Sequence, residues 1–317
     1  MPTSSDQAAA TQRSQPWRAL AALGVLIFAW GGNYTWIKIA LRDIGPWTFN
    51  ALRFCAAAGI VGLVLLAARG WRGLLPVRGE RTSLAAIGLL PGAVLTVLIT
   101  VSLLWINATH TVLLIYTTPV WTLALSIRML GERLTIFNAA GALLGLAGIV
   151  LLTNPLAMPW NTATLPGVAA ALVGAAAWAL GSVLYRRRVW QSTFWQQVFW
   201  QLAASGILTA AAAALFEWDH AIRLTPALVV ITVYNVLVPT ALAFWCWSQA
   251  LSRVKPTTAS QVLLLSPVFG VAQSHLVLGE PLTQSLIASA GCIVLGACLT
   301  ILQPRARSSS DALGHAP

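Results

Sequence analysis

The sequence predicts an all-α integral membrane protein with ten transmembrane helices, arranged as two inverted five-helix repeats. Three observations predict this fold: an apolar composition, apolar segments of helical length, and a residue pattern that recurs after 148 positions. Of the 317 residues, 58% are hydrophobic and 9% are charged, and the mean hydropathy is +0.77. Soluble domains carry about a quarter charged residues. A chain this apolar cannot cover itself with polar surface, so we expect lipid to be its solvent.

The apolar segments are continuous runs of roughly 20 residues, the length that a helix needs to cross the hydrocarbon core. Lipid offers no hydrogen-bond partners to the backbone, so a spanning segment is a helix or part of a closed barrel, and the lack of alternation favours helices. The expected spans of the first half are 19–41, 47–68, 83–105, 109–128 and 134–153, and those of the second half are 166–185, 194–214, 226–250, 257–277 and 282–302.

Proline punctuates these segments. Four prolines stand at or just before the start of a span, where the missing N–H costs no helical hydrogen bond: Pro46, Pro166, Pro226 and Pro281. The expected domains are a tail at 1–18, a first repeat at 19–153, a linker at 154–165, a second repeat at 166–302 and a tail at 303–317.

The distribution of positive charge predicts the orientation in the membrane. With the N-terminus in the cytoplasm, 15 of the 19 Lys and Arg residues fall on the cytoplasmic side, only Arg42 and Arg223 fall in opposite loops, and Lys38 and Arg53 fall within spans. Cytoplasmic loops of membrane proteins carry such an excess, which accounts for the net charge of +11 without a nucleic-acid partner. Arg outnumbers Lys 17 to 2 and alanine is abundant, which indicates a GC-rich bacterium. We expect a multi-pass protein of the bacterial inner (plasma) membrane with both termini in the cytoplasm.

The two halves share residues at one constant offset of 148 positions. The matches are Trp30 with Trp178, Lys38 with Arg186, Pro119-Val120 with Pro267-Val268, Leu130-Gly131-Glu132 with Leu278-Gly279-Glu280, and Gly148 with Gly296. Because five spans is an odd number, the second repeat must enter the membrane in the opposite orientation. Inverted repeats of this kind are typical of secondary transporters, in which the two halves exchange conformations.

The sequence resembles the drug/metabolite transporter superfamily, in its EamA branch, over about residues 19–302. The resemblance is carried by the segment Ala29-Trp30-Gly31-Gly32-Asn33, the two Leu-Gly-Glu junctions and the 5+5 arrangement of spans. The segment Tyr116-Thr117-Thr118-Pro119 and the aromatic content are similar to YddG-type exporters of aromatic amino acids. The resemblance implies export of amino acids and related metabolites. It also implies that the first, third, fourth, sixth, eighth and ninth spans line a central site.

No catalytic or metal-binding pattern is legible. The four Asp and four Glu residues lie in loops and tails or at span ends, the four His residues are scattered, and the four Cys residues lie in apolar runs without metal-ligand spacing. Gly141, Gly145 and Gly148 superficially resemble a phosphate-binding fingerprint, but on a membrane helix this spacing indicates close helix packing. We therefore expect no enzyme, no cofactor, no metal and no nucleic acid. The expected partners are the lipid bilayer and an amino-acid-like small molecule, and the oligomeric state stays open, with a monomer allowed.

Polar and aromatic residues inside spans are the candidate binding residues, because burying them in lipid is costly. They are Trp30, Asn33, Tyr34, Lys38, His110, Tyr116, Trp178, Tyr234, Trp245, Gln249 and Gln261. Alternatives stay open for several of them: Lys38 could snorkel to the interface, Trp30 and Trp178 could face lipid, and Trp245 could belong to an interfacial belt. Arg53 lies deeper in its span, and we expect it to face protein. A cavity lined by rings and amides would suit a partly apolar zwitterion.

Four further residues are candidates for a role in gating. Pro119 and Pro267 are matched prolines that remove a helical hydrogen bond and bend their helices. Glu132 and Glu280 are matched carboxylates near expected helix N-termini, where the simpler role is to stabilise the helix dipole.

The sequence thus predicts a carrier that exports small metabolites, foremost neutral and aromatic amino acids, by alternating access. No Asp or Glu lies deep in a span, so facilitated export is at least as compatible as proton antiport. The alternatives are an exchanger of other metabolites or drugs, a channel, and a polytopic membrane enzyme. An exchanger of phosphorylated or nucleotide-linked metabolites would need converging cations, and the spans offer only Lys38 and Arg53.

Overall fold

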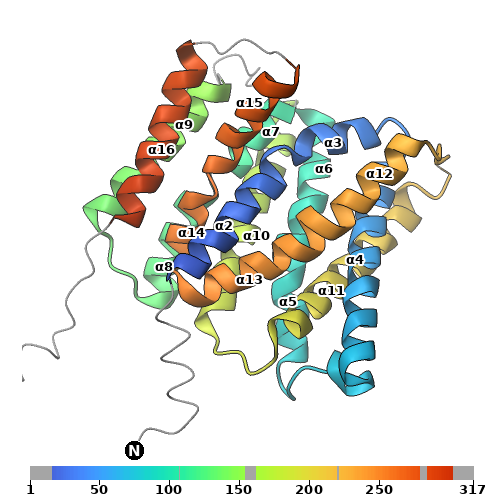
Figure 1. Cartoon of the computed structure of the whole chain (residues 1–317). Coiled ribbons are helices and arrows are strands. Elements are labelled where there is room, and N and C mark those ends of the chain that lie inside the picture. The colour runs from blue at the N-terminus through green and yellow to red at the C-terminus, as the bar shows by residue number, and fades with distance from the viewer. Residues whose placement is uncertain (1–15, 107, 154–161, 220, 279–283, 303–317) are drawn as a thin grey trace, which may run out of the picture.

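The computed structural model describes residues 16–106, 108–153, 162–219, 221–278 and 284–302, and these residues form a bundle of helices without strands (Figure 1). The helices of the first half are α2 (Pro16–Gly31), α3 (Asn33–Ala40), α4 (Pro46–Arg69), η1 (Trp71–Leu74), α5 (Arg81–Leu89), η2 (Leu90–Val94), α6 (Leu95–Trp105), α7 (Ala108–Ile115), α8 (Thr118–Leu130) and α9 (Ile136–Thr153). Those of the second half are α10 (Leu165–Arg187), α11 (Phe194–Phe216), α12 (Pro226–Asn235), η4 (Val236–Leu242), α13 (Ala243–Arg253), α14 (Pro256–Val262), α15 (Leu265–Leu278) and α16 (Gln284–Ile301). The prediction of an all-helical chain is confirmed.

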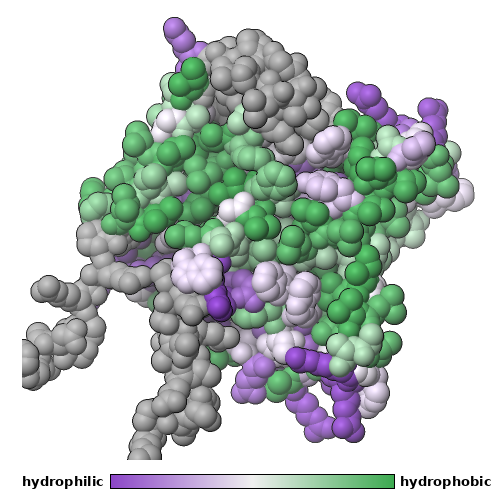
Figure 2. Space-filling view, viewed as in Figure 1, coloured by the Kyte–Doolittle hydropathy of each residue, from purple (hydrophilic) through white to green (hydrophobic). Residues whose placement is uncertain are grey.

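Every expected span contains helix, and several contain more than one helix. Six helices of the described chain are long and apolar enough to cross a membrane, namely Pro46–Arg69, Arg81–Ser102, Leu113–Leu130, Leu165–Arg187, Phe194–Phe216 and Pro226–Arg253. Three apolar helices are shorter: Trp17–Gly31, Ile136–Leu151 and Ile287–Ile301. Hydrophobic side chains cover much of the visible face of the bundle, and hydrophilic ones gather towards its ends (Figure 2). This is the surface expected of a protein whose sides contact lipid.

Several of the long helices are interrupted, and proline accounts for most of the interruptions. The helix widens into a π-helical turn at Pro91 in η2 and again at Pro239 in η4. Proline lacks an N–H and its ring clashes with the preceding turn, which a wider turn accommodates. The helix is broken between α7 and α8 just before Pro119, and between α14 and α15 just before Pro267.

Several helix pairs join the halves, and two of these pairs are the most extensive. α4 lies along α11, and α9 lies along α16 (Figure 1). Gly148 of α9 lies against Ser289 of α16, whose Oγ donates to its carbonyl at 2.7 Å, while Gly141 lies against Gly296 and Thr300. The contacts run in opposite order along the two helices, so α9 and α16 are antiparallel. A Cβ added to Gly148 would lie 2.5 Å from Ile293, so the prediction that these glycines serve close helix packing is confirmed.

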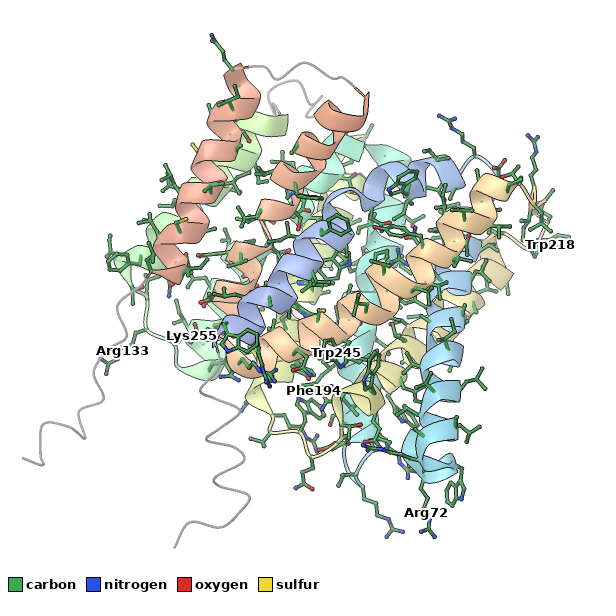
Figure 3. All side chains as sticks on the ribbon, viewed as in Figure 1. Arg72, Arg133, Phe194, Trp218, Trp245 and Lys255 are labelled. Carbon is green, nitrogen blue, oxygen red and sulfur yellow. The ribbon has the colours of Figure 1, made fainter. Side chains whose placement is uncertain are left out.

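Three described cations lie towards the same end of the bundle. We call the end at which α2 begins the lower end, and the opposite end, at which α3 ends, the upper end. Arg72, Arg133 and Lys255 lie towards the lower end, and Trp218 lies at the upper end (Figure 3). All three belong to the cations that the sequence analysis counted as cytoplasmic.

Candidate functional site

A cavity of about 240 Å³ lies between the two halves. The first half contributes Trp30, Asn33, Ile37, Leu41, Pro46, Asn50, Arg53, Phe54, Pro91, Leu95, Thr96, Ile99, Thr100, Ile115, Tyr116, Thr118 and Pro119 to its lining. The second half contributes Trp178, Pro239, Phe244, Ser260, Leu263, Leu264 and Ser266. Leu41 and Pro46 flank the loop between α3 and α4, so the cavity extends from the middle of the bundle to the upper end.

The lining combines rings, neutral hydrogen-bonding groups and one cation. Arg53 is the single charged residue among the described residues that line the cavity, and its guanidinium carbon lies 4.8 Å from the centre of the Phe54 ring. A cation over an aromatic face is attracted by the ring quadrupole, which fixes the orientation of the arginine. In the described part of the chain, no group of three His, Cys, Asp or Glu side chains could hold a metal ion. The site has the composition of a binding pocket for a partly apolar solute.

Two tryptophans, Trp30 and Trp178, line the inner end of the cavity, and a third, Trp247, packs against them. The Trp30 ring meets Trp178 edge-on with centroids 5.3 Å apart, and Trp178 lies 5.4 Å from Trp247. Trp30 Nε1 donates to the Pro239 carbonyl at 2.9 Å, inside the π-helical turn η4. The interruption of the helix at Pro239 thus presents the carbonyl that orients Trp30. This links α2 of the first half to η4 of the second half directly beneath the cavity.

A packed cluster closes the lower end, and we call it the aromatic plug. Its members are Leu23, Leu26, Tyr185, Trp190, Trp247 and Leu251. Tyr185 stacks on Trp190 with centroids 5.5 Å apart, and Trp190 Nε1 donates to the Tyr185 carbonyl at 2.9 Å. The Tyr185 hydroxyl donates to Gln197 Oε1, so its polar group is satisfied although the side chain is buried.

A polar contact joins the halves near the plug. Glu132, in the loop between α8 and α9, accepts a hydrogen bond from Thr257 Oγ1 of α14 at 2.9 Å. Burial raises the pKa of the Glu132 carboxyl, while the Thr257 bond and the positive charges of Lys255 and Arg186 oppose the increase. The N-terminus of α9 is held by Thr135, whose Oγ1 accepts from Asn138 N at 3.2 Å. Glu132 therefore contacts the second half in this structure, and Thr135 holds the N-terminus of α9 in its place.

Of the residues that the sequence analysis singled out for binding, Trp30, Asn33, Tyr116 and Trp178 meet at the cavity, and so does Pro119. Pro267 lies in the first turn of α15, next to the lining residue Ser266. The side chains of Tyr34, Lys38 and His110, and Glu280 as a whole, lie outside the described residues.

The other predicted binding residues lie away from the cavity. Trp245 stacks on Trp195 with centroids 5.6 Å apart in the lower half of the bundle (Figure 3). The Gln249 carbonyl accepts from Arg253 Nη1 at 2.9 Å. Gln261 donates to the Asn138 carbonyl at 3.0 Å between α14 and α9. Tyr234 is half-buried on α12 and does not line the cavity.

The cavity also contains residues that the sequence analysis did not propose for binding. They are mainly Asn50, Thr96, Thr100, Ser260 and Ser266, together with Arg53, which was expected only to face protein. The sequence did contain one signal for this region. Pro91 and Pro239 stand 148 residues apart, and both mark π-helical turns that border the cavity.

Two segments of the chain, residues 16–154 and 165–302, match the EamA-like transporter family. Similar curated proteins include "Uncharacterized transporter YoaV" of Bacillus subtilis, 24% identical over 86% of this chain and 94% of that protein. "Uncharacterized inner membrane transporter YedA" of Escherichia coli K12 is 28% identical, with 89% of this chain and 90% of that protein covered. "Uncharacterized protein PA1977" of Pseudomonas aeruginosa is 28% identical over 90% of this chain and 94% of that protein.

A solved crystal structure shares the fold. It superposes with a TM-score of 0.77 at 24% sequence identity, covering 90% of this chain and 96% of that one. At this level of identity the similarity concerns the fold alone.

Proposed function

Because this chain belongs to the EamA-like transporter family, we propose that it is a secondary transporter that exports small metabolites, foremost neutral and aromatic amino acids, by alternating access. The family and the curated relatives are membrane transporters, which argues against an enzyme. In this proposal ten spans form two inverted five-helix repeats in the bacterial inner membrane, and the lower end with both termini faces the cytoplasm. A relative named as an inner membrane transporter supports the location.

The inverted repeat is supported by elements that recur at the 148-residue offset. α9 and α16 begin and end 148 residues apart, and α4 and α11 begin 148 residues apart. The prolines of the two π-helical turns, Pro91 and Pro239, have the same separation. Matched helices pair in antiparallel fashion across the halves, as the glycine contacts of α9 and α16 indicate. A two-fold axis in the membrane plane would produce this arrangement.

One observation carries the proposal of alternating access: at three pairs of matched positions, the residue of the first half lines the cavity and its counterpart does not. Ile37, Leu95 and Ile99 line the cavity at the upper side. Their counterparts 148 positions later are Tyr185, Ala243 and Trp247, which are all buried in the cluster that contains the aromatic plug. If the two halves exchanged conformations, the cavity would close at the upper end and open at the lower end. Such an exchange is the basis of alternating access.

The lining supports a solute with both apolar and polar parts. Trp30, Phe54, Trp178 and Phe244 offer ring surfaces, and amide and hydroxyl groups alternate with them. A phosphorylated or nucleotide-linked solute would need several converging cations, whereas Arg53 is the one cation among the described lining residues. A zwitterionic amino acid with an apolar side chain fits this composition better.

Flux measured with purified protein in liposomes tests the proposal. Labelled neutral amino acids should leave vesicles that contain the protein faster than they leave protein-free vesicles. The rate of efflux should saturate with amino-acid concentration and should rise when unlabelled amino acid is present on the other side. Saturation and counterflow distinguish a carrier from a channel. The absence of flux across a broad amino-acid panel would refute the proposed substrate class.

A further inference from the structure

A second hollow lies on the side of the bundle, apart from the central cavity. It is a groove of about 380 Å³, and none of its lining residues lines the cavity. We call it the lateral groove. Its lining comes from α4, from the N-terminus of α11 and from η4, namely Ile60, Val61, Val64, Leu65, Ala68, Arg69, Thr193, Trp195, Leu237, Ala241 and Leu242.

The lateral groove is a wedge between two helical segments that diverge. α4 packs against η4, whereas α13, which continues from η4, is directed away from the lower part of α4 (Figure 1). Trp195 of α11 stacks on Trp245 of α13 with centroids 5.6 Å apart and so fills one side of the wedge. The part that no helix fills is the lateral groove.

The lateral groove has an apolar floor and is open at the side. Val61, Leu65 and Ala241 are buried at the floor. Val64 and Leu237 are exposed at the rim. Because the sides of a spanning bundle contact lipid, a hydrocarbon chain can enter from the bilayer. Such a chain would make the dispersion contacts that an empty groove lacks.

The length of the lateral groove matches one leaflet of a bilayer. The residues of α4 that line it recur at helical spacing on one face, from Ile60 to Arg69. Nine residues of helix rise by about 13.5 Å. The hydrocarbon core is about 30 Å thick, so one leaflet contributes about 15 Å. The lateral groove therefore runs along the lower leaflet for nearly its whole depth.

A cation stands where the headgroup of a bound lipid would lie. Arg69, in the last turn of α4, lines the lower end of the lateral groove, and no acidic residue is found among the described residues that line it. Glu80 is engaged elsewhere, because it accepts from the backbone N–H groups of Gln191 and Ser192 at 2.8 and 3.2 Å. Three more arginines follow before or at the start of α5: Arg72, Arg78 and Arg81. Basic clusters at the end of a span attract anionic lipids.

We propose that the lateral groove binds one anionic phospholipid of the lower leaflet, with an acyl chain between α4 and η4 and the phosphate at Arg69. The planar guanidinium matches the oxygens of a phosphate group. Trp195 adds a ring at the depth where tryptophans meet lipid headgroups. A zwitterionic phospholipid with the same chains also carries a cation, which weakens its attraction to Arg69. The groove is narrow and concave, which suits one chain better than the surface of a second copy of the protein.

The inference is independent of the solute that the protein transports. Leu237, Ala241 and Leu242 of η4 line the lateral groove, whereas Pro239 of the same turn lines the cavity. The lipid and the cavity would thus lie on two sides of one π-helical turn.

Native mass spectrometry of the purified full-length protein tests the inference, because it counts the lipids that each molecule retains. The detergent-solubilised protein is titrated with phosphatidylglycerol or with phosphatidylcholine of identical acyl chains. We expect the first phosphatidylglycerol to bind at least about fivefold more tightly than the first phosphatidylcholine, the factor associated with one cation near an anionic headgroup.

Two matched pairs of variants locate the site. Arg69→Gln should remove most of the preference for phosphatidylglycerol, whereas Arg78→Gln, at the same end but outside the lining, should keep it. Val64→Trp should largely abolish retention of the first lipid, whichever its headgroup, because the indole would occupy the lateral groove. Leu63→Trp is its control, since Leu63 is 67% exposed, much as Val64 is at 63%, but does not line the groove.

Four results would overturn the inference. They are equal affinity of the unaltered protein for the two lipids, equal preference in Arg69→Gln and Arg78→Gln, equal retention in Val64→Trp and Leu63→Trp, and a lipid-independent dimer that only Val64→Trp disrupts. The dimer would assign the lateral groove to a second copy of the chain. Thermal unfolding confirms that each variant is folded, and Ala68→Trp, one turn further along the same face, replaces Val64→Trp if that variant is not.

Discussion

The two halves of the bundle share a helical plan but differ where the first span of each half crosses the centre. In the first half the chain is interrupted at Gly32, between α2 and α3, whereas α10 continues without a break from Leu165 to Arg187. The counterparts of Gly31 and Gly32 at the 148-residue offset are Ala179 and Leu180. Two glycines in succession weaken a helix, and Gly31 also allows α15 to approach. The difference shows that the local sequence of each half decides where a helix is interrupted, even though the two halves have similar helices.

The same comparison explains which end is closed. The plug side contributes Tyr185 and Trp247, where the cavity side has Ile37 and Ile99 at the matched positions. Aromatic side chains bury more surface than isoleucine, so closing the lower end gains more apolar burial than closing the upper end would. In this account the asymmetry of the sequence makes the upper-open arrangement the resting state, and substrate binding compensates for the difference during transport.

The largest expected effect comes from preventing the halves from separating at the lower end. In a protein without native cysteines, Glu132→Cys and Thr257→Cys are joined by a short bifunctional thiol reagent with a reducible spacer. Transport should stop almost completely, because the Glu132–Thr257 contact connects the two halves. Flux before and after reduction measures the effect. A cross-link between Arg186→Cys and Ser252→Cys, within the second half, is the matched control, since Arg186 already bonds the Ser252 carbonyl. Undiminished flux in the Glu132–Thr257 cross-linked protein would contradict a moving lower end.

The next largest effect is expected at the ring cluster that separates cavity from plug. Trp30→Ala and Trp178→Ala should each reduce transport by about tenfold or more, because loss of the ring removes the inner wall of the site. The void that the ring leaves should also lower the free energy of unfolding by about 3–5 kcal/mol. Initial flux, corrected for the amount of inserted protein, measures the loss. Trp218→Ala is the control, because that ring is 81% exposed at the upper end. Equal flux in all three variants would mean that the central rings take no part in the pathway.

A smaller effect, on stability, is expected where α9 packs closely against α16. Gly148→Leu should lower the unfolding temperature by about 2 °C or more, since overpacking costs about 1–3 kcal/mol and the added side chain would enter α16. Gly291→Leu, on α16 itself, is the matched control because a Cβ there meets no atom within 4 Å. Thermal unfolding in detergent compares the two variants. Equal unfolding temperatures would contradict the close packing of α9 and α16.

The smallest effect should be a dependence of transport on pH at the lower end. Burial raises the pKa of the Glu132 carboxyl in the closed arrangement, so this arrangement favours the protonated form. Raising the pH through that pKa charges the carboxylate, penalises its burial and favours opening. Transport should therefore rise with pH by no more than about threefold relative to Glu132→Gln, because the group is partly solvated. Parallel pH profiles for the two proteins would exclude this contribution.

The helices themselves were largely predictable from the sequence. The expected span 194–214 corresponds to α11 (Phe194–Phe216), and 134–153 corresponds to α9 (Ile136–Thr153). Continuous apolar runs bounded by proline and charge carry this information, because lipid leaves the backbone no alternative to the helix. Which end of the bundle is open could not be predicted, because under the proposed alternating access the sequence allows both arrangements and only their packing energies differ.

The facing of individual side chains was predictable only where the helix stays regular. Trp30, Asn33, Tyr116 and Trp178 line the cavity as their positions indicated, whereas Trp245 does not. The π-helical turn η4 holds an extra residue, which rotates the following helix by about 100° relative to a regular count. Trp247, and not Trp245, meets the central rings. Gln261 precedes the break at Leu263–Leu264 and points to α9, since such breaks also invalidate a helical count.

The central claim is that the cavity and the plug exchange places, and thiol accessibility tests it most directly. Cys246, buried in the cluster that contains the plug, is kept as the single cysteine of one protein, and Ile99→Cys, at the cavity, is the single cysteine of another. A membrane-impermeant thiol reagent is applied from each side, without substrate and during turnover. We expect Ile99→Cys to react from the upper side without substrate while Cys246 is protected, and Cys246 to become reactive from the lower side during turnover. Continued protection of Cys246 while the protein transports, or full reactivity of both thiols in one condition, would contradict the account.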